Sequence, residues 1–236
     1  EIAQCLVGSE MCIRDRAMTV VVSIILVYTS LNICGNLVLY FFRFDVGNEG
    51  AYSIFAAVAF AAQVLVMMVI PLLRKRFSKS QLFISGFIIQ IAGFAVILIM
   101  AFAKLYTPQS WYILCLPGIL IYLGYGMLNV IMTIFLSDSV DYGEVMNGTR
   151  EESVIFSMQT FTVKLASGVA VFLAGLVVDW IHLDTAAAVQ TQDTLDALRM
   201  WMTIPSVILL IVGIFVFKRF YKLDDTRMEE IKSKLN

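Results

Sequence analysis

The sequence predicts an all-α integral membrane protein with six transmembrane helices. Sixty per cent of the 236 residues are hydrophobic, 15% are charged and the mean hydropathy is +0.85, whereas a water-soluble domain has about 25% charged residues. At about 20 apolar residues per crossing, the chain has room for about six crossings and their connections. Strict alternation of polar and apolar residues is absent, which argues against a β-barrel.

The stretch before the first apolar run, EIAQCLVGSEMCIRDR (residues 1–16), differs from the rest of the chain. It is too polar for the hydrophobic region of a signal peptide and ends without a small-residue cleavage site. Because CLVGSEMCIRDR resembles a translated sequencing adapter, we expect residues 1–16 to be non-native. Genuine protein would then begin near Ala17, with a segment missing before it. A real cytoplasmic lead-in is the alternative.

Six apolar runs follow, and each is long enough for a helix to cross a hydrocarbon core of about 30 Å. The fifth run differs from the others because it contains Lys164 near its middle and Asp179 near its end. We expect a six-helix bundle over residues 17–217 and a cytoplasmic tail over 218–236. The runs are 17–42, 51–73, 81–103, 111–137, 153–181 and 200–217, and the polar segments 138–152 and 182–198 are expected to be loops.

Basic residues are divided unevenly between the two ends of these helices. One end has four in residues 74–80, one in 138–152 and six in the tail, eleven in all. The other end has three: Arg43, Lys104 and Arg199. The positive-inside rule places the richer end in the cytoplasm. We therefore expect a multi-pass protein of the plasma (inner) membrane with both ends cytoplasmic.

Three of the runs carry a polar stripe, which is typical of a helix that lines a cavity. Helix packing by small residues is the alternative. Lys164 fits packing poorly, because an ammonium near the bilayer centre costs about 2.5–3.5 kcal/mol. We expect it to face water, substrate or a missing segment. At helical spacing, the stripes are Ser153, Ser157, Thr160, Lys164 and Ser167; Thr29, Asn32, Asn36 and Tyr40; and Tyr122, Gly126, Asn129 and Thr133.

The segment after the fourth run is acidic. Between residues 137 and 152 it has five acidic residues and one arginine, Arg150. Asp138 and Asp141 are one turn apart at a helix end, within reach of basic groups on neighbouring helices. A cytoplasmic ion-pair latch and a merely solvated loop both fit this spacing.

The same segment carries a family resemblance. The string S-D-S-V-D-Y-G-E at 137–144, followed by Arg150 and by F-S-M-Q-T-F-T-V-K-L-A-S, resembles the glycoside–pentoside–hexuronide:cation symporters of the major facilitator superfamily. Y-F-F-R-F at 40–44, with the Gly-Asn pair at 47–48, is similar to the end of the seventh helix in that family. The K-L-D run at 222–224 is similar to its C-terminal exit. The resemblance extends over about 17–235 and implies helices 7–12, the C-terminal half of a twelve-helix transporter.

This resemblance implies a binding cavity and a cytoplasmic gate. Lys164 would lie at the sugar and cation cavity, with Thr160 and Gln159 nearby, although Gln159 is turned about 140° from Lys164 on a helix. Asn129 stands where melibiose permease has a sugar-stacking tryptophan, so melibiose itself is not expected. The polar stripes add Asn32, Asn36 and Tyr40 to this predicted cavity. The predicted gate residues are Asp138, Asp141, Tyr142, Gly143, Glu144, Arg150 and Glu152.

We therefore expect a truncated secondary transporter that couples sugar or glycoside uptake to a cation by alternating access. The resemblance implies that Na⁺, Li⁺ or H⁺ is bound mainly by the missing N-terminal half, with no metal site and no other cofactor in this half. The expected partners are the sugar, the lipid bilayer and the missing six-helix half. The net charge of −1 gives no bias toward nucleic acid.

Three other functions are alternatives to this one. A related transporter of lipids or drug-like molecules would have a wider or more apolar cavity. A membrane fragment could insert without transporting anything. An intramembrane enzyme is disfavoured, because the chain has no H-E-x-x-H motif and one histidine, and only Lys164 and Asp179 are charged within the runs.

Overall fold

The structure is a computed structural model that describes residues 2–147, 152–187 and 189–220. In these residues every regular element is helical, and six segments are long and apolar enough to cross a membrane. The predicted fold class and the number of spans are confirmed. The elements are α1 (Ile2–Tyr40), the π-helix η1 (Phe41–Val46), α2 (Glu49–Leu73), α3 (Lys79–Phe102), the 3₁₀-helix η2 (Trp111–Leu114), α4 (Cys115–Asn147), α5 (Glu152–Trp180) and α6 (Gln192–Phe220).

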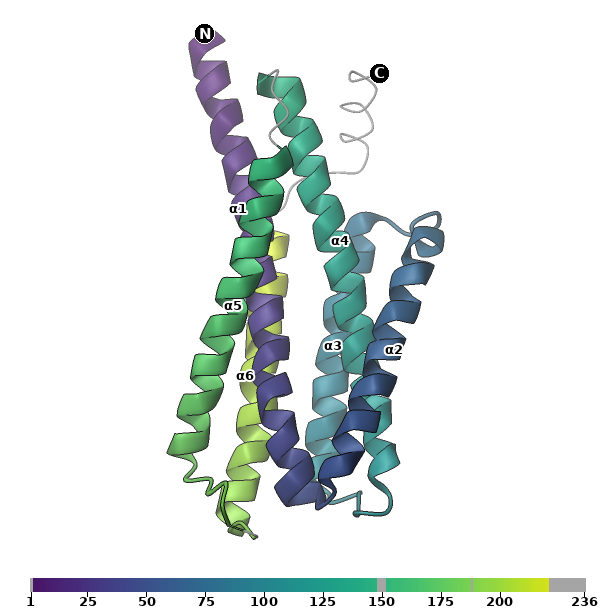
Figure 1. The fold of residues 1–236 in the computed structure, drawn as a ribbon. Helices are drawn as coiled ribbons and strands as arrows, with labels where there is room; N and C mark the ends of the chain where they lie inside the picture. The colour runs from purple at the N-terminus through teal and green to yellow at the C-terminus, as the bar shows by residue number, and fades with distance from the viewer. Residues whose placement is uncertain (1, 148–151, 188, 221–236) are drawn as a thin grey trace.

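The helices lie side by side and run in alternating directions (Figure 1). The start of α1, the α2–α3 turn and the end of α4 lie at one end of the bundle. The α1–α2, α3–α4 and α5–α6 connections lie at the other. We call the first the proposed cytoplasmic end and the second the proposed outer end. That residues 1–16 are non-native stays a prediction, and most of the predicted tail, residues 221–236, lies outside the described residues.

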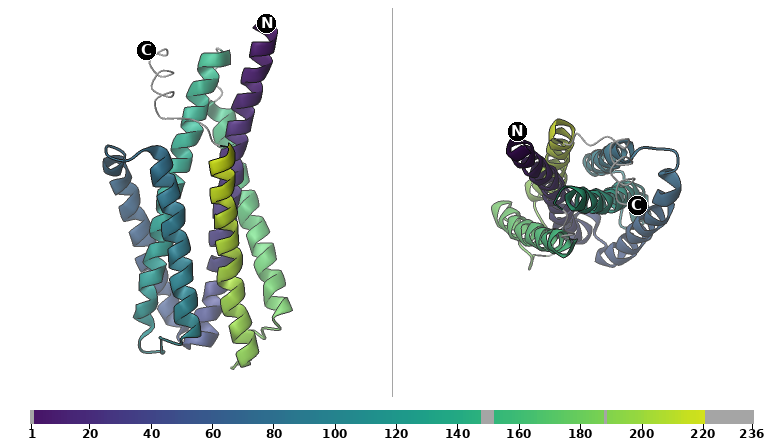
Figure 2. Two further views of the ribbon diagram at one scale, coloured as in Figure 1. Left: turned by 180° about the vertical axis from the view of Figure 1, so that it is seen from behind. Right: turned by 90° about the horizontal axis from the view of Figure 1, so that it is seen from above.

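Each of the two central helices, α1 and α4, packs mainly against helices from the other half of the chain. α1 packs mainly against α5 and α6, whereas α4 packs mainly against α2 and α3. Figure 2 shows the resulting division, with α1, α5 and α6 on one side and α2 and α3 on the other. Two inverted three-helix repeats, as found in many secondary transporters, would pack in this way. The α1–α4 and α3–α6 contacts join the two groups.

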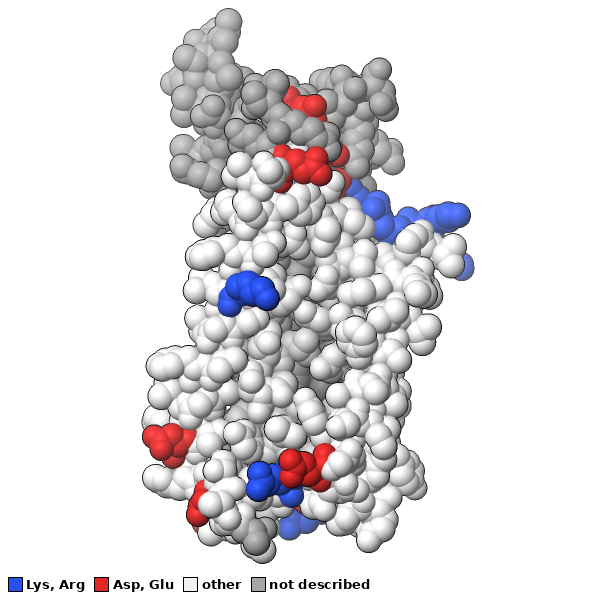
Figure 3. Space-filling view, in the orientation of Figure 1, with Lys and Arg blue, Asp and Glu red and all other residues white. Residues whose placement is uncertain are grey.

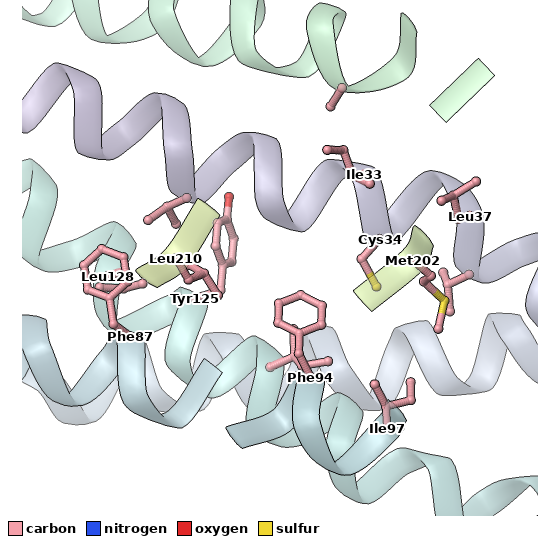
Figure 4. Packing of buried hydrophobic residues seen from close by; sticks show 14 of the residues in the cluster. Ile33, Cys34, Leu37, Phe87, Phe94, Ile97, Tyr125, Leu128, Met202 and Leu210 are labelled. Carbon is pink, nitrogen blue, oxygen red and sulfur yellow. The ribbon is translucent and has the colours of Figure 1, made fainter. Parts of the chain in front are cut away.

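The interior between the groups is mainly apolar, and its aromatic side chains pack closely. The rings of Phe83, Phe135 and Phe217 come from α3, α4 and α6, and their centroids lie 4.4–5.5 Å apart. Farther along, Phe94 of α3 points into the interior toward α1 (Figure 4). α3 and α4 approach so closely at Gly124 that a Cβ there would lie 2.6 Å from the backbone nitrogen of Gln90. Small residues at such interfaces are a common way to pack helices in membranes.

The helices extend beyond the apolar runs into charged sequence. α4 continues to Asn147, so most of the predicted loop 138–152 is helical, and α6 starts at Gln192, inside the predicted loop 182–198. Both loop predictions were therefore wrong in extent. An apolar run marks the part of a helix that crosses hydrocarbon. It does not mark the helical turns at the membrane surface, where charged side chains are solvated or paired.

Candidate functional site

Helix α5 has one face of small buried residues and one exposed polar face. Thr162, Ala166, Ala170 and Ala174 are buried and recur every four residues, so α1 can approach closely. In the predicted stripe, Ser153, Ser157, Thr160 and Lys164 are exposed and Ser167 is half-buried. A Cβ added to Gly168 or Gly175 would meet no atom within 4 Å. The exposed part of this stripe faces away from the other described helices.

Lys164 lies in the middle of that exposed face, twelve residues after the start of α5 and sixteen before its end. It makes no hydrogen bond or ion pair with the described residues. Figure 3 shows the middle of this side of the molecule as uncharged apart from an isolated basic group over α5. The hydroxyl of Thr160, one turn away, donates to the Phe156 carbonyl at 3.0 Å. A lysine in this position requires water, a substrate or a counter-charge from outside the described chain.

A chain of polar side chains connects α1, α4 and α5 beside this face. Asn129 Nδ2 donates to the Tyr28 hydroxyl at 2.6 Å, and Thr133 Oγ1 donates to the Asn129 carbonyl at 3.0 Å. Gln159 Nε2 lies 3.5 Å from Thr133 Oγ1, to which it donates. The structure thus brings Gln159 together with the α4 residues and leaves Lys164 on the adjoining face of α5. This agrees with the rotation expected between the two residues on a helix.

The predicted α1 residues lie along a half-buried line. Asn32 Nδ2 and Asn36 Nδ2 each donate at 2.7 Å to the carbonyl four residues earlier. Tyr40 is half-buried on the same line. Thr29, which the stripe included, is instead buried, and its hydroxyl has no hydrogen-bond partner in the described chain. Tyr28, four residues before Asn32, lies on this half-buried line instead, and it was not among the residues predicted from the sequence.

The surface is hollowed between the α5 and α2 sides of the bundle (Figure 3). A small cavity of about 20 Å³ lies between α1, α2, α3 and α4, and its lining includes Gly35, Tyr52 and Tyr122. Two larger grooves, of about 210 and 520 Å³, lie between α1, α5 and α6. They are lined by apolar side chains that include Trp201 and Pro205. The larger spaces therefore lack the hydrogen-bonding groups that orient a polar ligand.

The predicted gate residues lie mainly on the last turns of α4. Asp138 is 3% exposed and forms an ion pair with Lys79, the first residue of α3. This pair joins two helices within the bundle, whereas the gate was predicted to join the two halves of a transporter. That second role stays a prediction. Asp141 and Glu144 are half-buried, Glu152 is exposed at the start of α5, Tyr142 and Gly143 lie on α4, and Arg150 lies outside the described residues.

A denser group of charges, which we call the outer ion cluster, lies at the opposite end: Arg199, Asp45, Asp196 and Tyr106. The Arg199 guanidinium is 2% exposed and binds both Asp45 oxygens, Nε to Oδ2 at 2.8 Å and Nη2 to Oδ1 at 2.6 Å. Its Nη1 donates to Asp196 Oδ1 at 2.6 Å. The Tyr106 hydroxyl donates to Asp45 Oδ2 at 2.6 Å, and burial together with this bond raises the pKa of Tyr106 above its ordinary value.

This cluster was not predicted from the sequence. Arg199 was expected at the outer end, just before the sixth run, and only Lys164 and Asp179 were expected to be charged within the spans, which was wrong. The first span continues through η1 to Val46, and the last begins at Gln192, so Asp45 and Arg199 both lie within helices. The one sequence signal for the cluster was Asp45, an acidic residue close to the end of the first apolar run. A buried arginine requires a carboxylate partner, and Asp45 could have been proposed as that partner.

The chain is similar to known transport proteins. Residues 5–225 match the family described as MFS/sugar transport protein. The symporter YjmB of Bacillus subtilis (strain 168) is 26% identical over 219 residues, which cover 93% of this chain and 46% of YjmB. The isoprimeverose transporter of Lactiplantibacillus pentosus is 26% identical over 79% of this chain and 37% of its own length. The raffinose carrier protein of Pediococcus pentosaceus is 21% identical over 94% of this chain and 34% of its own length.

The chain thus spans between about a third and a half of the length of these relatives. The matched region includes all six spans, the α5 stripe and the acidic end of α4. The resemblance to sugar symporters of the major facilitator superfamily is confirmed. With six membrane-length helices and a family match over most of its length, the chain belongs to the MFS/sugar transport protein family of multi-pass membrane proteins.

Proposed function

We propose that this chain is the C-terminal half, helices 7–12, of a secondary transporter that moves a sugar or glycoside together with a cation by alternating access. The observation that carries the proposal is the exposed α5 face, with Lys164 at mid-membrane and no partner for it in the described chain. The names of two relatives, a transporter of isoprimeverose and a carrier of raffinose, support a sugar as the substrate.

A second six-helix half would cover this face. α5 and α2 bury the smallest shares of their spans among the six helices, and in lipid the α5 face would leave an ammonium against hydrocarbon. In this class of transporter the substrate and coupling-ion sites lie near the midplane between repeats. Lys164 would then meet acidic residues of the other half, which would bind most of the coupling Na⁺, Li⁺ or H⁺. Cation and sugar would favour each other's binding by about 1–3 kcal/mol.

A related transporter of lipids or drug-like molecules is the second candidate. The apolar grooves of about 210 and 520 Å³ between α1, α5 and α6 favour it. A sugar would find few hydrogen-bonding groups there, but an acyl chain would fit such a lining. A fragment that inserts without transporting is a third outcome of the same test.

The test compares two proteins in proteoliposomes: this chain alone, and this chain joined to the segment that precedes it in its source gene. Uptake of isoprimeverose and of raffinose is measured under inward gradients of Na⁺, Li⁺ or H⁺. We expect gradient-dependent accumulation of one sugar by the joined protein and none by the chain alone. Accumulation by the chain alone would contradict the half-transporter proposal. Uptake of a fluorescent phospholipid, with no sugar uptake by the joined protein, would favour the second candidate.

The orientation is tested separately. We propose that both ends of the bundle's chain are cytoplasmic and that the membrane is the plasma (inner) membrane, because basic residues concentrate at that end. Lys75 and Asp193 are exposed at opposite ends of the bundle. In a background without the native cysteines, Asp193→Cys should react with an impermeant maleimide in intact cells and Lys75→Cys only after lysis. Reaction of both variants in intact cells would contradict the six-span topology.

A further inference from the structure

We propose that the space between α5 and α6 holds one acyl chain of a phospholipid with an ammonium headgroup, as a resident lipid and not as cargo. α5 and α6 follow each other in the chain, yet each packs mainly against α1 and little against the other. Ile33 of α1 therefore lines the space between them, which comprises the two grooves of about 210 and 520 Å³. Figure 4 shows Ile33 on the side of α1 that faces α5. We call this space the α5–α6 groove.

The length of the groove matches one leaflet of a bilayer. Its lining on α6 runs from Met200 to Leu209, which is about 14 Å along the helix axis. That is about half of a hydrocarbon core about 30 Å thick. Its lining on α5 ends at Trp180, the last residue of that helix, so the groove starts near the proposed outer surface. An acyl chain that enters there would end near the bilayer midplane.

The lining suits hydrocarbon and ends in two tryptophans. The lining side chains are aliphatic or aromatic, apart from the thioether of Met200. The rings of Trp180 and Trp201 lie 6.3 Å apart, and Trp180 is 75% exposed. Neither indole N–H has a hydrogen-bond partner among the described residues. Tryptophan is enriched at membrane interfaces because its ring packs against acyl chains while its N–H bonds to polar groups. Both N–H groups can therefore donate to the ester or phosphate oxygens of a lipid.

The groove opens on the opposite side of α5 from Lys164. Leu173 lines both parts of the groove and is nine residues after Lys164. At 3.6 residues per turn, the two side chains lie about 180° apart around the helix. A second half of the transporter that covered the Lys164 face would therefore leave the groove open to lipid. A lipid bound there would lie away from the proposed path of the sugar, so the inference goes beyond the proposed function.

The rim of the groove is acidic. Residues 179–198 contain four aspartates and no lysine or arginine, and one exposed cation, Lys104, bonds to a glutamine side chain of this segment. Asp193 is exposed and precedes Met200 by seven residues, so it lies two turns above the groove on the same face of α6. Asp179 is exposed near the end of α5. Carboxylates attract an ammonium group and repel an anionic headgroup. The N–H donors of ethanolamine, which choline lacks, favour phosphatidylethanolamine.

The test uses the tryptophans as reporters in the chain, reconstituted into phosphatidylcholine nanodiscs. Trp111→Phe removes the third tryptophan, so that the fluorescence comes from Trp180 and Trp201. Brominated acyl chains quench tryptophan on contact and are supplied on phosphatidylethanolamine, phosphatidylcholine or phosphatidylglycerol. We expect half-maximal quenching by phosphatidylethanolamine at an about fivefold lower mole fraction than by phosphatidylcholine, as one surface ion pair would give. Phosphatidylglycerol should quench least. Asp193→Asn should remove the preference for phosphatidylethanolamine.

The matched variants add a ring inside or outside the groove. Val177→Phe fills the groove and should abolish the preferential quenching. Val171→Phe makes the same change at an exposed position, turned only about 20° from Lys164 around α5, and should have no effect. If Val177→Phe lowers the melting temperature, Ile204→Phe fills the groove from α6 instead.

Three results would overturn the proposal. The first is equal quenching by the three lipids in the Trp111→Phe protein, and the second is an equal effect of the two valine variants. The third is uptake of a fluorescent phospholipid that Val177→Phe abolishes, because the groove would then be a transport path. The quenching experiment contains no sugar and no cation gradient. Its outcome is therefore separate from that of the proposed function.

Discussion

Buried ion pairs occupy corresponding places at the two ends of the bundle. At the proposed outer end, Asp45 follows α1 and meets Arg199 near the start of α6. At the proposed cytoplasmic end, Asp138 near the end of α4 meets Lys79 at the start of α3. If α1–α3 are matched in order with α4–α6, the pair between the end of α1 and the start of α6 corresponds to the pair between the end of α4 and the start of α3. Inverted repeats would show this correspondence. Each pair fastens the end of a central helix to the start of a helix packed against it.

The two pairs nevertheless differ in geometry. Arg199 presents a planar fork to both oxygens of Asp45, and Asp196 and Tyr106 complete the cluster. Lys79 presents a compact ammonium to Asp138. A guanidinium fork fixes direction as well as distance, whereas an ammonium tolerates rotation about its partner. In the outer ion cluster the guanidinium therefore fixes the orientation of Asp45 as well as its distance, whereas the Lys79 ammonium leaves the orientation of Asp138 less constrained.

Lys164 differs from both pairs, because the described chain supplies it with no partner at all. In the joined transporter, Lys164→Ala should abolish cation-driven accumulation, since the acids that would face it lose their counter-charge. Its melting temperature should change little, because no contact within the bundle is lost. Lys164→Arg should restore transport poorly. Uptake under a cation gradient and the melting temperature in detergent measure the two effects.

The control for this prediction is Lys75→Ala, which removes an exposed lysine from the α2–α3 turn. It should transport normally. Near-normal uptake and unchanged cation dependence in Lys164→Ala would show that this lysine has no role in coupling. A large loss of stability in the same variant would show that it has a structural partner.

The outer ion cluster should give the largest effect on stability. Arg199→Ala leaves Asp45 buried without its counter-charge, which costs about 3–5 kcal/mol. This corresponds to a fall of about 10 °C in melting temperature at about 2–4 °C per kcal/mol. Adding Asp45→Asn should recover part of that loss, because the uncompensated charge is then removed. If the double variant is as unstable as the sum of the single variants, the two residues are not coupled.

The Lys79–Asp138 pair should affect transport more than stability. In the joined transporter, Asp138→Asn should shift the equilibrium toward the inward-open state and lower accumulation several-fold, with a smaller change in sugar affinity. Asp141→Asn, three residues later on α4, should act in the same direction if the acidic end of that helix forms a gate. Lys79→Arg should retain transport, whereas Arg199→Lys should lose stability. If Lys79→Arg and Arg199→Lys change transport and melting temperature to the same extent, the difference in geometry between the two pairs has no functional consequence.

The sequence predicts some of this well and some of it poorly, for physical reasons. Spans are predictable because hydrocarbon requires long apolar helices, and the α5 stripe is predictable because helical period sets its spacing. The outer ion cluster depends on η1 and on an early start of α6, and Asp45 and Arg199 are 154 residues apart in sequence. In the sequence, Tyr28 cannot be distinguished from an aromatic residue of the core, because its hydrogen bond to Asn129 is visible only in the structure.

The smallest effect concerns Tyr106, whose hydroxyl donates to Asp45 beside the Arg199 fork. Tyr106→Phe should cost about 1 kcal/mol at neutral pH, because Asp45 keeps both bonds from Arg199. Since burial raises the pKa of Tyr106 above its ordinary value of 10.0 in the folded protein, its contribution is fully present below pH 10. It is lost as the pH rises further, because the unfolded phenol ionises first. The melting temperatures of the wild type and Tyr106→Phe should therefore converge between pH 8 and pH 11. A difference in melting temperature that stays constant over this range would show that the Tyr106 hydroxyl does not stabilise the cluster.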